Sequence, residues 1–165
     1  MKILVASSEA APFAKTGALA DVSAALPVEL GRLGADASVI IPAYRQVFEC
    51  GQPIETLGIE VEIPIGNKRV RGEILRSYLP DSNVPVYLVS QDQYYDRPGL
   101  YQQNGTDYID NCERFVFFCR AVMEAIRLLN LQTDVLHCND WATGLIPAYL
   151  SIEYRYVPGY EQIAT

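Results

Sequence analysis

The sequence predicts a doubly wound α/β fold, a Rossmann-like parallel sheet with a β-hairpin insertion. Short apolar runs that suit strands buried on both faces alternate along the chain with stretches whose apolar residues recur at helical spacing. In the middle, two strand-like stretches are joined by Gly66-Asn67, a pair typical of a tight hairpin turn. Because the chain has 165 residues, half of them hydrophobic, and no visible linker or repeat, a single domain over residues 1–165 is expected.

The beginning of the chain predicts a βαβ unit. Residues 2–7 form a continuous apolar run, which is the expected central strand of the sheet. Residues 19–33 form a helical pattern that stops at Gly34. Residues 35–41 then predict the second strand, which ends at Pro42.

The first predicted helix carries a proline in its interior. Pro27 lacks a backbone donor and its ring would clash with the carbonyl of Ser23, so a bend or a two-segment helix is predicted. The side chains predicted to share the apolar face of this helix are Leu19, Val22, Leu26, Leu30 and Leu33.

A β-hairpin is predicted in the middle of the chain, with strands at residues 58–64 and 69–79. Charged and apolar residues alternate in it, so one face is expected to meet water. Residues 85–89 form a further apolar run that suits a buried strand. After it comes a polar, tyrosine-containing loop over residues 91–106, and long loops of this kind in compact domains are commonly functional.

A long helix is predicted after this loop, capped by Thr106 or Asp107. The residues predicted to share its apolar face are Ile109, Cys112, Val116, Cys119, Met123 and Ile126. Cys112 and Cys119 would lie two helical turns apart, beyond the Cα separation of about 7 Å that a disulfide tolerates. They are therefore interpreted as core thiols, and all cysteines of the chain are expected to be free.

The last strand is predicted over residues 134–138 and the last helix over residues 142–154. Asn139 or Asp140 is the natural N-cap of that helix. The tail beyond the helix is polar and irregular until a new apolar stretch begins at residues 163–165.

Composition excludes several classes of function. The net charge is −7 and there is no run of lysine and arginine, so electrostatic binding to nucleic acid or to an anionic membrane is not expected. The single histidine rules out a multi-histidine metal site, and no metal is expected. The four cysteines form no C-x-x-C pair, and neither a signal sequence nor a membrane-spanning run is visible, which favours a reducing cytoplasm.

The loop between the first strand and the first helix is a candidate binding site. In an open α/β sheet, ligands bind at the carboxyl ends of the strands, where a following helix points its free amides outward. Lys15 adds a mobile positive charge, Thr16 a hydroxyl, and Gly17 a backbone that a ligand can approach closely. These features suit a phosphate. The alternative is an ordinary turn with a solvated lysine, because the spacing matches neither a dinucleotide fingerprint nor a P-loop.

Three stretches, taken together, resemble a known family. They are residues 7–17 (Ser-Ser-Glu-Ala-Ala-Pro-Phe-Ala-Lys-Thr-Gly), residues 95–101 with 108–115 (Tyr-Asp-Arg-Pro-Gly-Leu-Tyr and Tyr-Ile-Asp-Asn-Cys-Glu-Arg-Phe), and residues 137–141 (His-Cys-Asn-Asp-Trp). In this order and spacing they closely resemble the N-terminal domain of bacterial glycogen synthases and plant starch synthases. The resemblance covers essentially the whole chain.

The resemblance implies a glycosyltransferase of the two-domain GT-B type. Such enzymes move glucose from ADP-glucose to the non-reducing end of an α-1,4-glucan with retention of configuration, and they use no cofactor. The family's N-terminal domain continues through a Thr-Ile-His-Asn-like segment, and a second Rossmann-like domain carries most of the nucleotide contacts. The partners implied for this chain are ADP-glucose, the glucan acceptor and that C-terminal domain, without which it is expected to be inactive.

The resemblance also assigns site residues. Lys15 resembles the family's lysine that contacts the phosphates of ADP-glucose, and Gly17 with the amide of Ala18 resembles the glycine pair beside them. The positions that match the sugar or acceptor side of the family's cleft are Glu9, Asp21, Tyr95, His137 and Asp140, with His137 and Asp140 as the catalytic candidates. A cation at Lys15 would stabilise the charge that builds on the departing diphosphate.

Several of these residues also have a purely structural interpretation. Tyr95 is either a loop anchor or a platform on which a sugar ring stacks. His137 also suits a hydrogen-bonded residue at the end of a strand, and Asp140 suits a helix cap. Asp21 also suits the dipole of the helix in which it lies, and Trp141 is interpreted as core packing.

The sequence departs from the family pattern at two positions. Ala18 stands where the family usually has a second glycine, which bears on the geometry of the phosphate site. Ala142 stands where the family often has a histidine, which removes a polar group from the expected cleft.

Two other functions compete with a catalytic fragment. The chain could be a non-catalytic glucan-binding or scaffold module with the same fold, and the continuation of the reading frame beyond Thr165 into a second Rossmann-like domain would decide against that. It could also resemble another GT-B transferase, such as a sucrose synthase or a glycan phosphorylase, which the joint presence of the Lys15 loop and the segment 137–141 disfavours.

Overall fold

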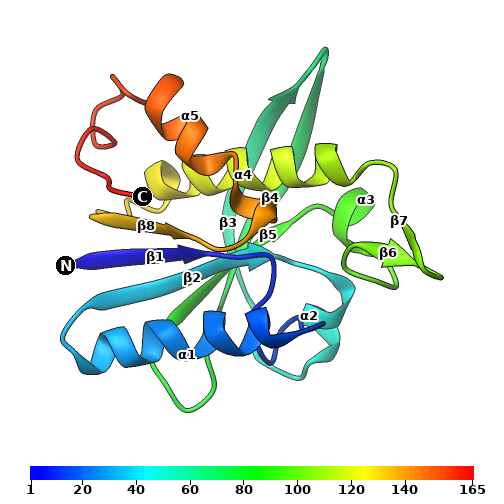
Figure 1. The fold of residues 1–165 in the computed structure, drawn as a ribbon, viewed down its shortest axis with the longest axis horizontal. Coiled ribbons are helices and arrows are strands. Elements are labelled where there is room, and N and C mark those ends of the chain that lie inside the picture. Colours follow the sequence, from blue (N-terminus) through cyan, green and yellow to red (C-terminus); the bar gives the residue numbers. More distant parts are fainter.

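The computed structural model describes residues 1–165, and its centre is one six-stranded sheet between helices (Figure 1). The strands, in the order in which they lie side by side, are β3 (Glu55–Ile65), β4 (Lys68–Tyr78), β5 (Pro85–Ser90), β2 (Asp36–Pro42), β1 (Lys2–Ala6) and β8 (Val135–Cys138). The long helix α1 (Ala18–Arg32) covers one face, and α4 (Asn111–Leu128) and α5 (Ile146–Ile152) cover the other (Figure 1).

The topology confirms the doubly wound α/β class. Strands β5, β2, β1 and β8 are parallel, and the predicted hairpin β3–β4 turns at Gly66 and Asn67. Because β4 pairs antiparallel with β5, the hairpin extends the same sheet and makes it mixed. Strand β1 lies next to β8 near one side of the sheet, so its expected central place is wrong. The two hairpin strands, added beyond β5, move the middle of the sheet away from it.

Burial along the strands follows the sequence pattern. In β3, Val61 and Ile63 are buried while Glu60 and Glu62 are exposed, so the prediction that one face of the hairpin meets water is confirmed. The apolar stretch predicted at residues 163–165 reaches the outer edge of β8, where Ala164 forms a parallel bridge with Val135.

Helix α1 differs from the prediction in two ways. It is a single helix of 15 residues with Pro27 inside it, so the two-segment form is wrong. A proline lacks only its own backbone donor, and Pro27 is buried within the continuous helix. The buried face is Ala20, Ser23 and Pro27, whereas Val22 and Leu33 of the predicted face are exposed. Small side chains on this face let α1 lie close to the sheet.

The end of α1 is as predicted. Gly34 has φ of +89°, a conformation that glycine adopts without strain. The amide of Ala35 then donates to the carbonyl of Leu30 at 3.0 Å, which satisfies a carbonyl of the last turn.

Helix α4 begins later than predicted. Thr106 and Asp107 do not cap it, because they form β7 (Thr106–Asp107), which pairs with β6 (Gln102–Gln103) in a small hairpin. The helix follows Asp110, whose carboxylate binds Arg97 instead of the helix amides. Sequence preference for a cap is overridden here by an ion pair.

The apolar face predicted for α4 is correct only in its second half. Cys119, Met123 and Ile126 are buried, whereas Ile109 precedes the helix and is fully exposed. Cys112 is also exposed, so the core-thiol interpretation is wrong for Cys112 and correct for Cys119. The prediction that all four cysteines are free is confirmed.

The last predicted helix is divided in two. Asp140 accepts a hydrogen bond from the amide of Trp141, but it opens the short 3-10 helix η1 (Trp141–Thr143), and α5 begins only at Ile146. The loop over residues 91–106 also has structure that was not predicted, namely α3 (Asp92–Tyr95) and the β6–β7 hairpin.

The loops that follow β1, β2, β5 and β8 all leave the same edge of the sheet, because those four strands are parallel (Figure 1). They bring the Lys15 loop, α2 (Arg45–Glu49), α3 and η1 to that edge, which is where ligands bind in this class of sheet. None of the helices combines the length and the apolar composition that crossing a membrane requires.

Candidate functional site

The Lys15 side chain lies at the carboxyl edge, paired with Asp21 from the first turn of α1. Its Nζ is 2.5 Å and 2.7 Å from the two carboxylate oxygens. Both side chains are more than half exposed, at 52% and 58%, so the pair is worth at most about 1 kcal/mol. An anion that reaches Lys15 can therefore exchange with Asp21 at little cost.

Glu9 lies beneath this loop and is only 3% exposed. Its carboxylate accepts hydrogen bonds from the amide and the hydroxyl of Thr16, both at 2.6 Å, and from the amide of Gly17 at 3.3 Å. The hydroxyl of Tyr101 donates to it at 2.7 Å. Glu9 thus does not line an open cleft as expected from the resemblance. It shapes the loop that presents Lys15, because a carboxylate bound by four donors has no free oxygen for a ligand.

The backbone at Gly17 and Ala18 leaves room for a ligand. Gly17 has an extended conformation with φ of −153°, which any residue adopts, and a Cβ placed there would meet no atom within 4 Å. The fold itself thus gives no reason for glycine here. Gly17 is the N-cap of α1 but supplies no side-chain hydrogen bond. The first backbone N–H groups of the helix are therefore free to donate to an anion.

The segment after β8 forms the other half of the candidate site. His137 is exposed, with Nε2 3.0 Å from Oδ1 of Asn139. Asp140 is exposed and has φ of +63° with ψ of −179°, a region used almost only by glycine. Such backbone costs about 1–3 kcal/mol and is concentrated at functional sites. Both catalytic candidates therefore face solvent at the edge where the Lys15 loop lies.

Trp141 is not core packing, since it is 55% exposed. One side of its ring rests on Phe115 and Tyr101, with centroid separations of 4.7 Å and 5.8 Å. It forms a partly exposed aromatic surface beside Asp140.

Tyr95 lies in the core and has no exposed surface. Its hydroxyl donates to the carbonyl of Arg114 at 2.9 Å, and its ring packs edge-on against Tyr44. Burial raises the pKa of this hydroxyl well above its ordinary value. A sugar cannot stack on a ring that is fully covered, so the cleft role is wrong for Tyr95 and the loop-anchor alternative is correct.

Ala142 also points away from the cleft. It is 1% exposed, and its carbonyl accepts a hydrogen bond from the thiol of Cys119. The departure from the family pattern at this position therefore changes the interior beneath η1 rather than the open surface.

The chain matches the model of a protein family described as the starch synthase catalytic domain, over residues 2–165. The chain belongs to this family. It is 46% identical to the glycogen synthase of Syntrophotalea carbinolica over 165 residues, covering 100% of this chain and 34% of that protein. It is 41% identical to the glycogen synthase of Rhodopirellula baltica over 174 residues, again covering 100% of this chain and 34% of that protein.

A solved structure of the same class is also similar. It is the catalytic domain of starch synthase IV from Arabidopsis thaliana bound to ADP and acarbose, with a TM-score of 0.77 and 26% sequence identity. The match covers 98% of this chain and 32% of that one. This member of the starch synthase family therefore spans about a third of the length of the relatives that it matches, and its fold agrees with that of the starch synthase IV domain.

Sequence reasoning missed the residues that hold the loop over 91–110 of this starch synthase family chain. Arg114 is fully buried, and it donates to the carbonyls of Tyr94 and Leu100 at 2.7 Å and 2.9 Å and to Oδ1 of Asn111 at 2.6 Å. An arginine among the apolar residues of a helix was a signal that could have identified it, since a buried guanidinium must find several acceptors.

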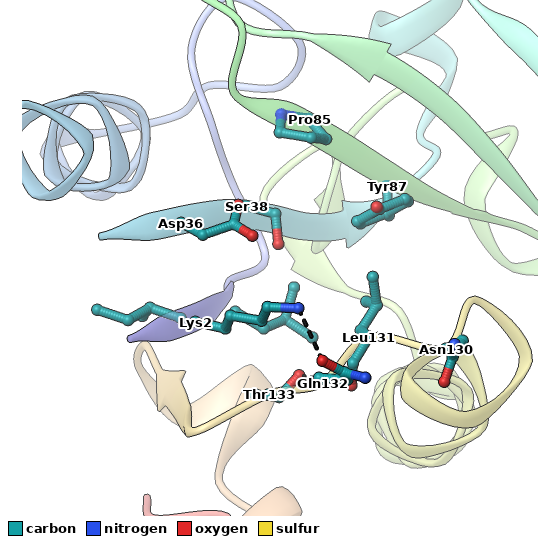
Figure 2. Close-up of a pocket in the computed structure, with 11 residues that line it drawn as sticks. Lys2, Asp36, Ser38, Pro85, Tyr87, Asn130, Leu131, Gln132 and Thr133 are labelled. Carbon is teal, nitrogen blue, oxygen red and sulfur yellow. Dashed lines mark hydrogen bonds between the residues drawn. The ribbon is translucent and has the colours of Figure 1, made fainter. Parts of the chain in front are cut away.

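A hollow of about 130 Å³ lies at the opposite end of the sheet, outside the candidate site (Figure 2). Its lining comes from the amino ends of β1, β2 and β5 and from residues 130–133, and Lys2 Nζ binds Gln132 Oε1 there at 3.0 Å. It is smaller than ordinary ligand sites, which span roughly 300–1,000 Å³. The open surface at the carboxyl edge is thus the better candidate for this family member.

Proposed function

We propose that this chain is the N-terminal part of a retaining glucosyltransferase that moves glucose from ADP-glucose to the non-reducing end of an α-1,4-glucan. The observation that carries the proposal is the Lys15 loop, where an exchangeable lysine, an unobstructed glycine and the uncapped amides of α1 share one exposed surface. That set of groups suits a diphosphate. The glycogen synthase relatives, and the starch synthase IV structure with ADP and acarbose, support the donor and acceptor classes.

Lys15 would release Asp21 and bind the diphosphate of the donor in its place. When the bond between glucose and the diphosphate breaks, negative charge builds on the leaving phosphate. A cation and helix amides already in place stabilise that charge more in the transition state than in the ground state. The residues on this surface thus need no metal ion for leaving-group stabilisation, and no cofactor is part of the proposal.

His137 and Asp140 would face the sugar and the acceptor. The strained backbone of Asp140 fixes its carboxylate relative to β8, and the exposed Trp141 beside it offers an apolar ring face to a glucose unit. Neither residue alone makes a pocket, because both are open to solvent. The proposal therefore includes a second domain of the same enzyme that closes over this surface, and a cytoplasmic location in line with the free thiols.

The test is glucosyl transfer from ADP-glucose to glycogen, measured with residues 1–165 alone and with the complete protein. We expect turnover only with the complete protein, because closure of two domains is what excludes water and aligns donor and acceptor. Transfer by residues 1–165 alone would overturn the two-domain part of the proposal. A complete protein that binds glycogen without using ADP-glucose would favour the non-catalytic glucan-binding alternative.

A further inference from the structure

We propose that Tyr101 is a positioning residue that couples the Lys15 loop to the Asp140–Trp141 segment. Its hydroxyl binds the carboxylate that shapes the loop, and its ring supports the exposed tryptophan. The catalytic consequence rests on the proposed function, whereas the coupling itself rests only on the contacts of Tyr101.

The hydroxyl of Tyr101 contacts the first loop from a distance of more than ninety residues in sequence. It donates to Oε1 of Glu9 at 2.7 Å, and Oγ of Ser8 lies 2.7 Å from the Tyr101 hydroxyl oxygen. Oε1 of Glu9 also accepts from the hydroxyl of Thr16, while Oε2 holds the Thr16 amide. One tyrosine hydroxyl is therefore part of the set of donors that fixes the carboxylate under the Lys15 loop.

The ring of Tyr101 makes the second connection. It lies against Trp141 with a centroid separation of 5.8 Å and against Phe115 at 6.0 Å, and Phe115 itself packs edge-on against Trp141. Trp141 follows Asp140 directly, so the ring of Tyr101 supports the backbone that carries the Asp140 carboxylate. The two contacts use different parts of the side chain.

Tyr101 is itself held firmly. Its carbonyl accepts hydrogen bonds from the side-chain amide of Asn111 at 2.8 Å and from the backbone amide of Tyr108 at 3.0 Å. Asn111 in turn binds the buried guanidinium of Arg114. Burial raises the pKa of the Tyr101 hydroxyl above its ordinary value. Tyr101 thus connects the Lys15 loop to the network around the buried Arg114.

The separate contacts allow a test by two variants in the complete protein. Tyr101→Phe keeps the ring and removes the hydroxyl, whereas Tyr101→Leu removes both contacts. Hydrogen exchange is measured in the peptides that cover residues 13–19 and 138–144. We expect Tyr101→Phe to speed exchange of residues 13–19 at least tenfold and to leave 138–144 within twofold of wild type, and Tyr101→Leu to speed both.

The control is Tyr78→Phe, the same chemical change at an exposed tyrosine that donates no side-chain hydrogen bond. Kinetics supply a second readout. Tyr101→Phe is expected to lower kcat/KM for ADP-glucose about tenfold while KM for glycogen stays within twofold, and Tyr101→Leu is expected to raise KM for glycogen as well.

Exchange of residues 13–19 in Tyr101→Phe that stays within twofold of Tyr78→Phe would overturn the coupling. The two proposals fail separately. If the wild-type protein transfers no glucose, the proposed function is wrong, and the exchange data still decide whether Tyr101 holds the loop.

Discussion

The loop after β1 carries an exposed ion pair and a buried carboxylate, which differ in how tightly they are held. Lys15 and Asp21 form the exposed pair, with more than half of each side chain open to water. Glu9 is the buried carboxylate, and it accepts hydrogen bonds from four donors. A pair worth at most about 1 kcal/mol exchanges partners readily, whereas a buried carboxylate that loses a donor leaves polar groups unsatisfied. The loop that presents the exchangeable Lys15 is therefore held in place by the buried carboxylate of Glu9.

Lys15→Ala in the complete protein gives the largest expected effect. We predict a fall in kcat/KM for ADP-glucose of about 10²–10³-fold, because a preorganised charge at the leaving group is worth about 3–4 kcal/mol. The melting temperature should change by less than about 1 °C, because the side chain is exposed and only weakly paired. Steady-state kinetics and a thermal melt measure the two quantities. Wild-type activity in this variant would defeat the phosphate role of Lys15.

Glu9→Gln tests the buried carboxylate beneath the loop. The amide group presents donors where Glu9 now only accepts, so we predict a loss of about 1–3 kcal/mol in the free energy of unfolding, measured by denaturant titration. Glu60→Gln is the matched control, since Glu60 is exposed on the hairpin, and it should stay within about 0.5 kcal/mol of wild type. Equal stability of the two variants would mean that Glu9 does not hold the loop.

Two buried tyrosine hydroxyls allow a comparison between a buried polar group with a hydrogen-bond partner and one without. The hydroxyl of Tyr44 is buried without a hydrogen-bond partner, whereas that of Tyr95 donates to the carbonyl of Arg114. We predict that Tyr44→Phe stabilises the protein by about 1 kcal/mol and that Tyr95→Phe destabilises it by about the same amount. The midpoints of urea unfolding should therefore move in opposite directions. A loss of stability in Tyr44→Phe would show that its hydroxyl has a partner.

Ala18→Gly has the smallest expected effect. Ala18 is the first residue of α1 and its φ is not positive, so glycine gains nothing from its wider conformational range there. We predict a loss of a few tenths of a kcal/mol in stability and an unchanged KM for ADP-glucose in the complete protein. An improved KM would mean that the second glycine of the family pattern matters for donor binding.

The sequence-based predictions were accurate where a feature depends on neighbouring residues and inaccurate where it depends on contacts with distant parts of the chain. The end of α1 at Gly34 and the hairpin turn at Gly66 depend on the conformation of one or two residues, and both were predicted correctly. The buried face of α1 was predicted wrongly, because leucine spacing does not reveal that small side chains pack against the sheet. The start of α4 was missed because Asp110 binds the distant Arg97.

The same distinction applies to the candidate site. Lys15 and Gly17 are neighbours in one strand–loop–helix unit, so the sequence alone predicted that they share the loop after the first strand, whereas the pairing of Lys15 with Asp21 was not predicted. Tyr95 stood in a polar loop, and nothing near it in sequence indicated that the loop folds inward around Arg114. Tyr101 was assigned no role of its own, because its partners Ser8, Glu9 and Trp141 come from two other segments.

The sequence by itself determined the order of the main strands and long helices, the parallel arrangement that brings four loops to one edge, and the chemistry of the Lys15 loop, but not the short elements α2, α3, β6, β7 and η1. The features that it determined follow from short-range periodicity, turn residues and the handedness of βαβ units. Only the tertiary structure decided which charged groups are exposed and exchangeable and which are buried and fixed. Burial is set by what packs above a residue, and for Glu9, Tyr95 and Tyr101 those atoms come from segments far away in the chain.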